Sequence, residues 1–281
     1  MIRRVTTDAG VLEVRDTGDS TDPPVVLLHG FPQDSRCWNA VEPLLHGAGL
    51  RTLAPDQRGY SPQASPHDVR AYRMRALTAD VIAVLDALGL EKAHVVGHDW
   101  GGAVAWGLGA AFPDRVASLT VLSTPHPRAL MASMTRSSQP LRSWYTLAFQ
   151  LPMLPELLLS RTLVTALRLS GLPLHLAREY GERFSSPDEL FGPLAWYRAA
   201  ARGPVWQPAK DQDAGSSAIT SPTTYVWGSK DFALGRAAAE ATAEYVVGDY
   251  RFVELAAGHW LPELYPDVVA EAIIDRVGSG R

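Results

Sequence analysis

The 281-residue sequence has a single cysteine, Cys37, and this scarcity excludes several kinds of site. One cysteine cannot form an internal disulfide, and it cannot build a multi-cysteine zinc or iron–sulfur site. No group of His, Asp and Glu has metal-ligand spacing, and the sequence has neither a P-loop nor a complete dinucleotide-binding glycine motif. We therefore expect chemistry that uses side chains and water, with no cofactor and no metal.

Long apolar runs and an excess of basic residues are also missing. Every apolar stretch is interrupted by a charge, a proline or a glycine pair before it reaches the roughly 20 residues of a membrane-spanning helix. Residues 1–5 carry positive charge, but residues 6–10 are not the apolar segment of a signal peptide. The net charge of -4 provides no basic surface for nucleic acid. We expect a cytoplasmic protein with no membrane span and no nucleic-acid partner.

The sequence does contain a regular alternation of short β-branched runs and longer helical patterns. Residues 25–28 form a continuous apolar run, and the short segments 50–54, 93–97 and 119–122 repeat the pattern; all four predict strands that are buried on both faces of a sheet. Residues 38–46, 74–88 and 102–112 lie between these runs and have helical patterns. This order predicts an α/β fold with a mostly parallel central sheet flanked by helices.

The alternation is interrupted in the middle of the chain. From residue 128 to about residue 210 the sequence is helical, rich in Leu and Arg, and broken by prolines. Strand patterns return at residues 223–227 and 250–255, with a helix between them and another after residue 266. The simplest interpretation is a core of residues 1–127 and 212–281, with a helical cap domain inserted at residues 128–211. Three separate domains are the alternative, but the last two strands would then have no sheet to join.

The strongest motif is Gly97-His98-Asp99-Trp100-Gly101-Gly102, which follows a predicted strand and opens a helix. It has the form of the strand-to-helix nucleophile elbow, with aspartate where serine hydrolases have serine, so a serine esterase is excluded. A carboxylate is ionised at neutral pH and can displace a leaving group from an sp³ carbon without a base. The product is an alkyl ester of Asp99, and its hydrolysis needs a water-activating base and an oxyanion hole.

Candidates for these roles follow other predicted strands. His259, in Gly258-His259-Trp260, comes after the last strand, where the chain order of such enzymes places the base. Asp231 follows the preceding strand and can hold the imidazole in the required tautomer. The main-chain N–H groups of Trp100 and Phe31 are expected to form the oxyanion hole, because Pro32 has no N–H to donate.

Taken in order, these motifs resemble those of the α/β-hydrolase-fold epoxide hydrolases over nearly the whole chain. The resemblance rests on five segments: His29-Gly30-Phe31-Pro32, Asp56-Gln57-Arg58-Gly59-Tyr60-Ser61, Gly97-His98-Asp99-Trp100-Gly101-Gly102, Lys230-Asp231-Phe232 and Gly258-His259-Trp260. It implies an α/β-hydrolase fold with an inserted helical cap. The aspartate nucleophile is shared with the haloalkane dehalogenases.

The resemblance also implies two cap tyrosines that hold and protonate the epoxide oxygen. Tyr145 matches the family context Tyr-x-x-x-Phe-Gln-x-Pro, and Tyr197 matches the context Trp-Tyr-Arg. Opening the ring makes an alkoxide, to which a phenol can donate a proton at neutral pH. Two departures from the family pattern are Gln57, where leucine is common, and Gln33-Asp34, where Glu-Ser is frequent. We expect them to tune the pocket mouth and to have no catalytic role.

The leading hypothesis is hydrolysis of a small apolar epoxide to a vicinal diol. A haloalkane or haloacid dehalogenase is the alternative, because it uses the same nucleophile, base and acid, although Phe31, Trp100 and the tyrosine pair depart from its patterns. A non-catalytic ligand-binding protein of the same fold is a third hypothesis. Residues in or next to the motifs are expected to line an apolar pocket: His29, Pro32, Trp38, Trp144, Trp196 and Trp260. The sequence is compatible with a monomer or a homodimer.

Overall fold

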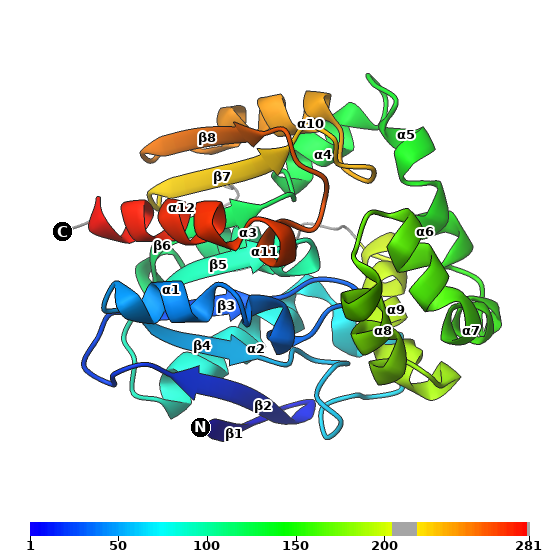
Figure 1. The fold of residues 1–281 in the computed structure, drawn as a ribbon, viewed down its shortest axis with the longest axis horizontal. Coiled ribbons are helices and arrows are strands. Elements are labelled where there is room, and N and C mark those ends of the chain that lie inside the picture. Colours follow the sequence, from blue (N-terminus) through cyan, green and yellow to red (C-terminus); the bar gives the residue numbers. More distant parts are fainter. Residues whose placement is uncertain (204–217, 280–281) are drawn as a thin grey trace.

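The computed structural model describes residues 1–203 and 218–279, and these contain a sheet of eight strands (Figure 1). The strands are β1 (Ile2–Thr7), β2 (Gly10–Thr17), β3 (Pro24–Leu28), β4 (Arg51–Pro55), β5 (Ala93–His98), β6 (Val116–Leu122), β7 (Thr223–Gly228) and β8 (Tyr250–Leu255). Their order across the sheet is β1-β2-β4-β3-β5-β6-β7-β8. β2 pairs antiparallel with β1 and β4, and the other neighbours are parallel. The predicted α/β class is confirmed.

The parallel strands β3 to β6 coincide with the four strand segments predicted from the sequence. Val25 to Leu28 in β3 are fully buried, because helices cover both faces of the sheet at this position. The hairpin of β1 and β2 was not predicted. In β2 the buried positions alternate and include Asp16, whose carboxylate lies 2.8 Å from the guanidinium of Arg51. This alternation of buried and partly exposed positions, with a charged residue at a buried one, differs from the apolar segments by which the parallel strands were predicted.

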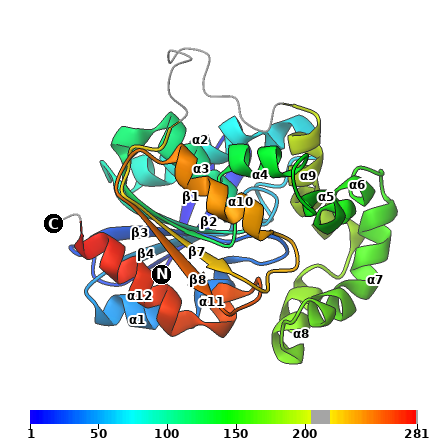
Figure 2. The same ribbon diagram turned by 90° about the horizontal axis from the view of Figure 1, so that it is seen from above.

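Helices cover the two faces of the sheet, as Figure 2 shows along the edge of the strands. α2 (Met74–Ala87), α3 (Trp100–Ala111) and α10 (Arg236–Ala241) lie on one face. α1 (Glu42–Gly47) and α12 (Pro266–Gly278) lie on the other face, and the short α11 (Leu261–Leu264) precedes α12. Short 3-10 helices occur at Ser35–Trp38, Val69–Tyr72, Pro113–Arg115 and Thr242–Tyr245. The loops that follow the carboxyl ends of the parallel strands lie together at one edge of these three layers.

A helical insertion, defined here as residues 127–203, follows β6. It contains α4 (Pro127–Ser133), α5 (Gln139–Arg142), α6 (Trp144–Ala148), α7 (Leu154–Leu169), α8 (Leu174–Arg183) and α9 (Pro187–Ala201). In Figure 1, α5 to α9 lie on the right, beyond the arrowheads of the parallel strands. α4 packs against α10 and the 3-10 helix Thr242–Tyr245 of the core. The division into residues 1–127, 128–211 and 212–281 stays a prediction, and its boundary at residues 211 and 212 lies outside the described residues.

Close backbone contact joins the helical insertion to the core. Gly59, with a φ of 87°, lies against Gly192 of α9, and a Cβ added to Gly192 would lie 2.5 Å from the Cα of Gly59. Next to this contact, the indole N–H of Trp196 donates to the carbonyl of Arg58 at 2.9 Å. Glycine is therefore needed on both sides, because any side chain would push α9 away from the core.

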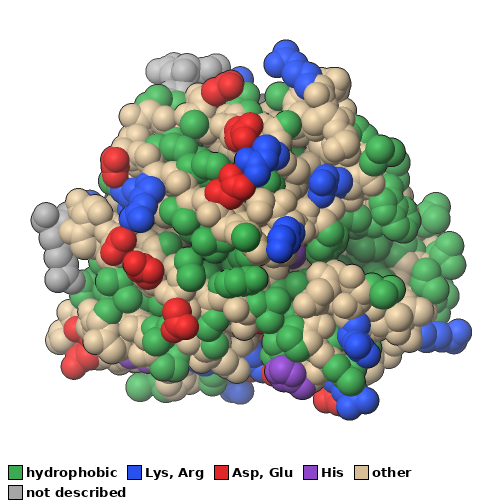
Figure 3. All heavy atoms as spheres, turned by 45° about the horizontal axis from the view of Figure 1, so that its top comes forward, with side chains coloured by type: hydrophobic (Ala, Val, Ile, Leu, Met, Phe, Trp, Pro, Cys, Tyr) green, Lys and Arg blue, Asp and Glu red, His purple; other side chains and the backbone are tan. Residues whose placement is uncertain are grey.

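The outer surface of the helical insertion is unusually apolar. Figure 3 shows hydrophobic side chains gathered at the right of the molecule, whereas charges of both signs are mixed elsewhere on this face. The large exposed apolar residues of α5, α6 and α7 are Leu141, Trp144, Leu147, Leu154, Leu157, Leu158 and Leu169. Within the described residues, no helix is both long enough and apolar enough to span a bilayer.

Candidate active site

Asp99 occupies the sharp turn between β5 and α3. Its backbone has φ 51° and ψ -118°, which an L-residue rarely adopts, and its side chain is 17% exposed. A Cβ on Gly97 would lie 2.2 Å from the carbonyl oxygen of Gly101, and a Cβ on Gly101 would lie 2.1 Å from that of Leu28. The two glycines thus let β5, α3 and β3 approach closely enough to present the Asp99 carboxylate at the end of the central strands.

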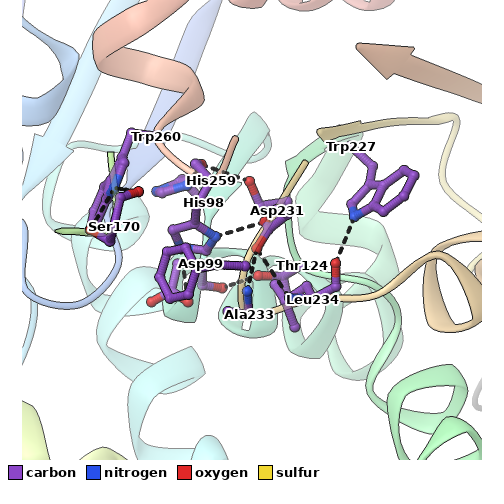
Figure 4. A network of polar contacts seen from close by, with 12 residues as sticks. His98, Asp99, Thr124, Ser170, Trp227, Asp231, Ala233, Leu234, His259 and Trp260 are labelled. Atoms are coloured by element: carbon purple, nitrogen blue, oxygen red, sulfur yellow. Dashed lines mark hydrogen bonds and ion pairs between the residues drawn. The ribbon is translucent and has the colours of Figure 1, made fainter. Parts of the chain in front are cut away.

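His259 and Asp231 meet Asp99 from the loops that follow β8 and β7 (Figure 4). The Nδ1 atom of His259 lies 2.8 Å from Asp231 Oδ2, and its Nε2 atom lies 3.7 Å from Asp99 Oδ2. The other oxygen of Asp231 accepts hydrogen bonds from the N–H groups of Ala233 and Leu234, at 2.8 and 3.0 Å. Asp231 is therefore fixed by its own loop, and it orients the imidazole so that Nε2 faces Asp99.

The charges around His259 determine its protonation. Burial alone lowers the pKa of His259, but the charge and hydrogen bond of Asp231 and the charge of Asp99 outweigh burial and raise it to about 9. In this resting state His259 is an imidazolium between two carboxylates. It can act as a base only after one of the neighbouring negative charges is removed.

Main-chain donors surround the carboxylate of Asp99. The N–H of Phe31 donates to Asp99 Oδ1 at 2.8 Å, and the N–H of Trp100 also hydrogen-bonds this carboxylate. Burial raises the pKa of Asp99, whereas the charge of His259 and these two N–H groups oppose the rise. The two N–H groups predicted for the oxyanion hole thus converge on the side chain that would carry the developing negative charge.

Two tyrosines from the helical insertion face this group. The ring of Tyr197, on α9, lies 4.9 Å from the ring of Trp100 and 5.5 Å from that of Phe31. The ring of Tyr145, on α6, lies 6.3 Å from that of Tyr197. Burial, and next the charge of Asp99, raise the pKa of both phenols, so both are protonated at neutral pH. The structure therefore brings together the five predicted catalytic side chains.

The comparison with known proteins agrees with this architecture. A family model described as alpha/beta hydrolase fold matches residues 23–264. The chain belongs to the α/β-hydrolase fold family. It is 35% identical to the AB hydrolase superfamily protein YfhM of Bacillus subtilis over 96% of each chain. It is 32% identical to epoxide hydrolase A of Mycobacterium tuberculosis, over 97% of this chain and 96% of that protein.

Solved structures of other proteins are similar to this chain in fold. Epoxide hydrolase A of Mycobacterium thermoresistibile matches with a TM-score of 0.84 and 32% identity, over 99% of this chain and 98% of that one. The resemblance carried by the five sequence motifs is thus confirmed, because named epoxide hydrolases are similar to this chain in sequence and in fold.

The predicted pocket residues occupy different surroundings in this hydrolase. Trp38 and His29 are fully buried in the core, and His29 Nε2 accepts the N–H of Gln57 at 3.1 Å. Trp144 is exposed.

Trp196 and Trp100 line part of a cavity of about 310 Å³. Pro32 and Trp260 are buried, and the indole N–H of Trp260 points to Ser170. The lining of the pocket stays a prediction.

Sequence reasoning missed a polar cluster beside the triad. The prediction that Gln33 lies at the pocket mouth is wrong, because Gln33 is fully buried and contacts His98. Glu263, on α11, was not singled out, although its carboxylate accepts a hydrogen bond from Gln33. Its position four residues after His259 was the one available signal. In the described parts of the chain, no group of three or more His, Cys, Asp and Glu side chains could hold a metal ion.

Proposed function

We propose that this protein hydrolyses an epoxide to a vicinal diol through an alkyl ester on Asp99. The observation that carries the proposal is the pair of phenols from α6 and α9 beside Asp99 and its main-chain donors. The similarity to named epoxide hydrolases supports the substrate class. Because α6 and α9 supply these phenols, the helical insertion acts as the cap of the site.

The first half-reaction joins Asp99 to the substrate. A carboxylate oxygen of Asp99 attacks one ring carbon, and the bond between that carbon and the epoxide oxygen breaks. Tyr145 or Tyr197 gives its phenolic proton to the departing oxygen, which becomes the first hydroxyl of the diol. Both phenols are protonated at neutral pH, so a donor is available without a further ionisable group.

The second half-reaction hydrolyses the ester. Esterification removes the negative charge of Asp99, so His259 gives its proton to the tyrosine phenolate and can then take one from water. The resulting hydroxide attacks the ester carbonyl carbon, and the N–H groups of Phe31 and Trp100 stabilise the oxyanion. Collapse breaks the bond between the carbonyl carbon and the alkyl oxygen, which takes the proton from His259. The remaining proton of the water returns His259 to its imidazolium form as Asp99 returns to its carboxylate.

A trapped intermediate tests this function. His259→Gln removes the base, so an adduct of the mass of the substrate should accumulate on Asp99 and be located by peptide mass spectrometry. The matched control, Asp99→Asn with His259→Gln, should carry no adduct. Aryl and alkyl epoxides, haloalkanes and fluoroacetate should be compared with the wild-type protein. Turnover of epoxides without any adduct in His259→Gln would refute the covalent route. Turnover of halogenated compounds alone would identify a dehalogenase.

A further inference from the structure

A carboxyl group that the proposed mechanism does not use lies beside the base. Glu263 Oε1 accepts hydrogen bonds from the amide of Gln33, at 2.6 Å, and from the hydroxyl of Tyr180 on α8, at 2.9 Å. Its second oxygen, Oε2, is buried and has no hydrogen-bond partner within residues 1–203 and 218–279. Burial raises the pKa of Glu263, whereas the hydrogen bonds from Gln33 and Tyr180 oppose the rise. Burying a carboxylate with one oxygen unpaired destabilises the folded protein, which points to a role of Glu263 in the site.

Gln33 connects this carboxyl group to the catalytic loops. Its Oε1 accepts the N–H of Gly30 at 2.9 Å, so the amide nitrogen must point to Glu263. The same Oε1 lies 2.8 Å from Nδ1 of His98, and Nε2 of His98 lies 2.9 Å from the carbonyl oxygen of His259. Two side chains therefore link Glu263 to the main chain of the base.

The cluster of Glu263, Gln33 and His98 has fewer hydrogen-bond donors than acceptor atoms. Both ring nitrogens of His98 face carbonyl oxygens, but a neutral imidazole carries one proton. Burial, and next the charge of His259, lower the pKa of His98 well below its usual range. The additional proton that a negative charge on Glu263 favours therefore lies on His259, whose ring centre is 4.9 Å from that of His98. The other ionisable groups that face His259 are Asp99 and Asp231. Those around Glu263 are Tyr180 and Cys37.

We propose that Glu263 is a positioning residue for ester hydrolysis, which acts through Gln33 and His98 on the base His259. The linked side chains hold the carbonyl of His259, and the negative charge of Glu263 stabilises the imidazolium that forms when His259 takes a proton from water. Tyr180 fixes the carboxylate from the helical insertion. This inference rests on the proposed function, because it assigns Glu263 to the second half-reaction.

The charge can be removed without removing the hydrogen bonds. In Glu263→Gln, the amide oxygen can still accept from Gln33 and Tyr180, so a merely structural role predicts no change. We expect the pKa of His259, followed by NMR, and the acidic limb of ester hydrolysis to fall by on the order of one pH unit. The plateau rate of ester hydrolysis should fall by about threefold to tenfold, because His259 becomes a weaker base. Glu271→Gln, on the exposed side of α12, is the matched control and should change neither.

Exchange of the two residues gives a second test. Gln33→Glu alone places two carboxyl groups against each other, so it should be less stable than the wild type. Adding Glu263→Gln restores one carboxylate and one amide, with Gly30 and His98 still able to donate to position 33. The double variant should recover the pH limb and the plateau rate.

The two hypotheses fail in different ways. If wild-type protein turns over no epoxide and forms no adduct, the proposed function fails. If wild-type protein does both, and Glu263→Gln leaves the pKa of His259 and the pH limb unchanged, the inference is wrong. A shift of the limb in Glu263→Gln that the double variant does not reverse would also refute it, because the charge would then not act through position 33.

Discussion

The charge of Asp99 should hold His259 in its protonated form, and Asp99→Asn tests this directly. The substitution keeps the size of the side chain and removes its charge, while Asp231 remains 2.8 Å from Nδ1 of His259. Nε2 of His259 lies 3.7 Å from Asp99 Oδ2. Opposite charges at such a distance shift a pKa by about 1–3 units. We therefore expect the pKa of His259 to fall from about 9 in the wild type to about 6–8 in Asp99→Asn.

The measurement is an NMR titration of the imidazole resonances, with His259 assigned by comparison with His259→Gln. Intact mass checks that the amide at position 99 is retained. Asp114→Asn changes an exposed residue of the 3-10 helix that follows α3; this variant is the matched control and should leave the titration unchanged. If His259 has the same pKa in Asp99→Asn as in the wild type, the ion pair is not the cause of its protonation. The ester could then not convert His259 into a base by neutralising Asp99.

Three further outcomes are expected. The double variant Tyr145→Phe with Tyr197→Phe should slow epoxide opening by about 100- to 10,000-fold in pre-steady-state assays. Fast opening would show that the phenols are not the proton donors. Loss of epoxide opening with unchanged dehalogenation would support their role as donors. Gly192→Ala should destabilise the fold by about 1–3 kcal/mol in denaturant titrations, because the new methyl group overlaps Gly59; wild-type stability would mean that α9 moves away freely. Folding raises the pKa of His259 from 6.5 to about 9, so this group adds about 3 kcal/mol to the free energy of unfolding at pH values below 6.5, and the contribution is lost as the pH rises through about 9. His259→Gln should therefore flatten the dependence of the unfolding free energy on pH in this range.

The positions of the proposed catalytic residues could be predicted because their sequence neighbours reflect a backbone constraint. The elbow at Asp99 requires glycines on both sides, and the loops after β7 and β8 deliver Asp231 and His259 to the same edge of the sheet. The parallel strands were predictable because burial on both faces leaves continuous apolar runs. These features are local in sequence even though they act together in space.

Other features depend on contacts that leave no local pattern. Gln33 and Glu263 are separated by 230 positions, so nothing near either residue indicates the hydrogen bond between them. Trp38 lies beside a site motif, but packing directs its side chain into the core. The single helix predicted over residues 38–46 is two elements: a 3-10 helix ends at Trp38, and α1 begins at Glu42, with Pro43 in its first turn, where the missing N–H costs no helix hydrogen bond. Tertiary packing decides side-chain direction and helix boundaries in these cases.

The two phenols are spaced by bonds that lie wholly inside the helical insertion. Gln150 donates to the carbonyl of Tyr197 at 3.2 Å, and Arg198 donates to the carbonyl of Phe149 and pairs with the buried Glu156. In the proposed scheme, ring opening depends on this separately braced unit, whereas the groups that hydrolyse the ester belong to the core. Substitutions in the insertion can therefore change which epoxides are opened while the hydrolytic groups stay in place. Such a division lets the substrate range of an enzyme diverge without rebuilding its chemistry.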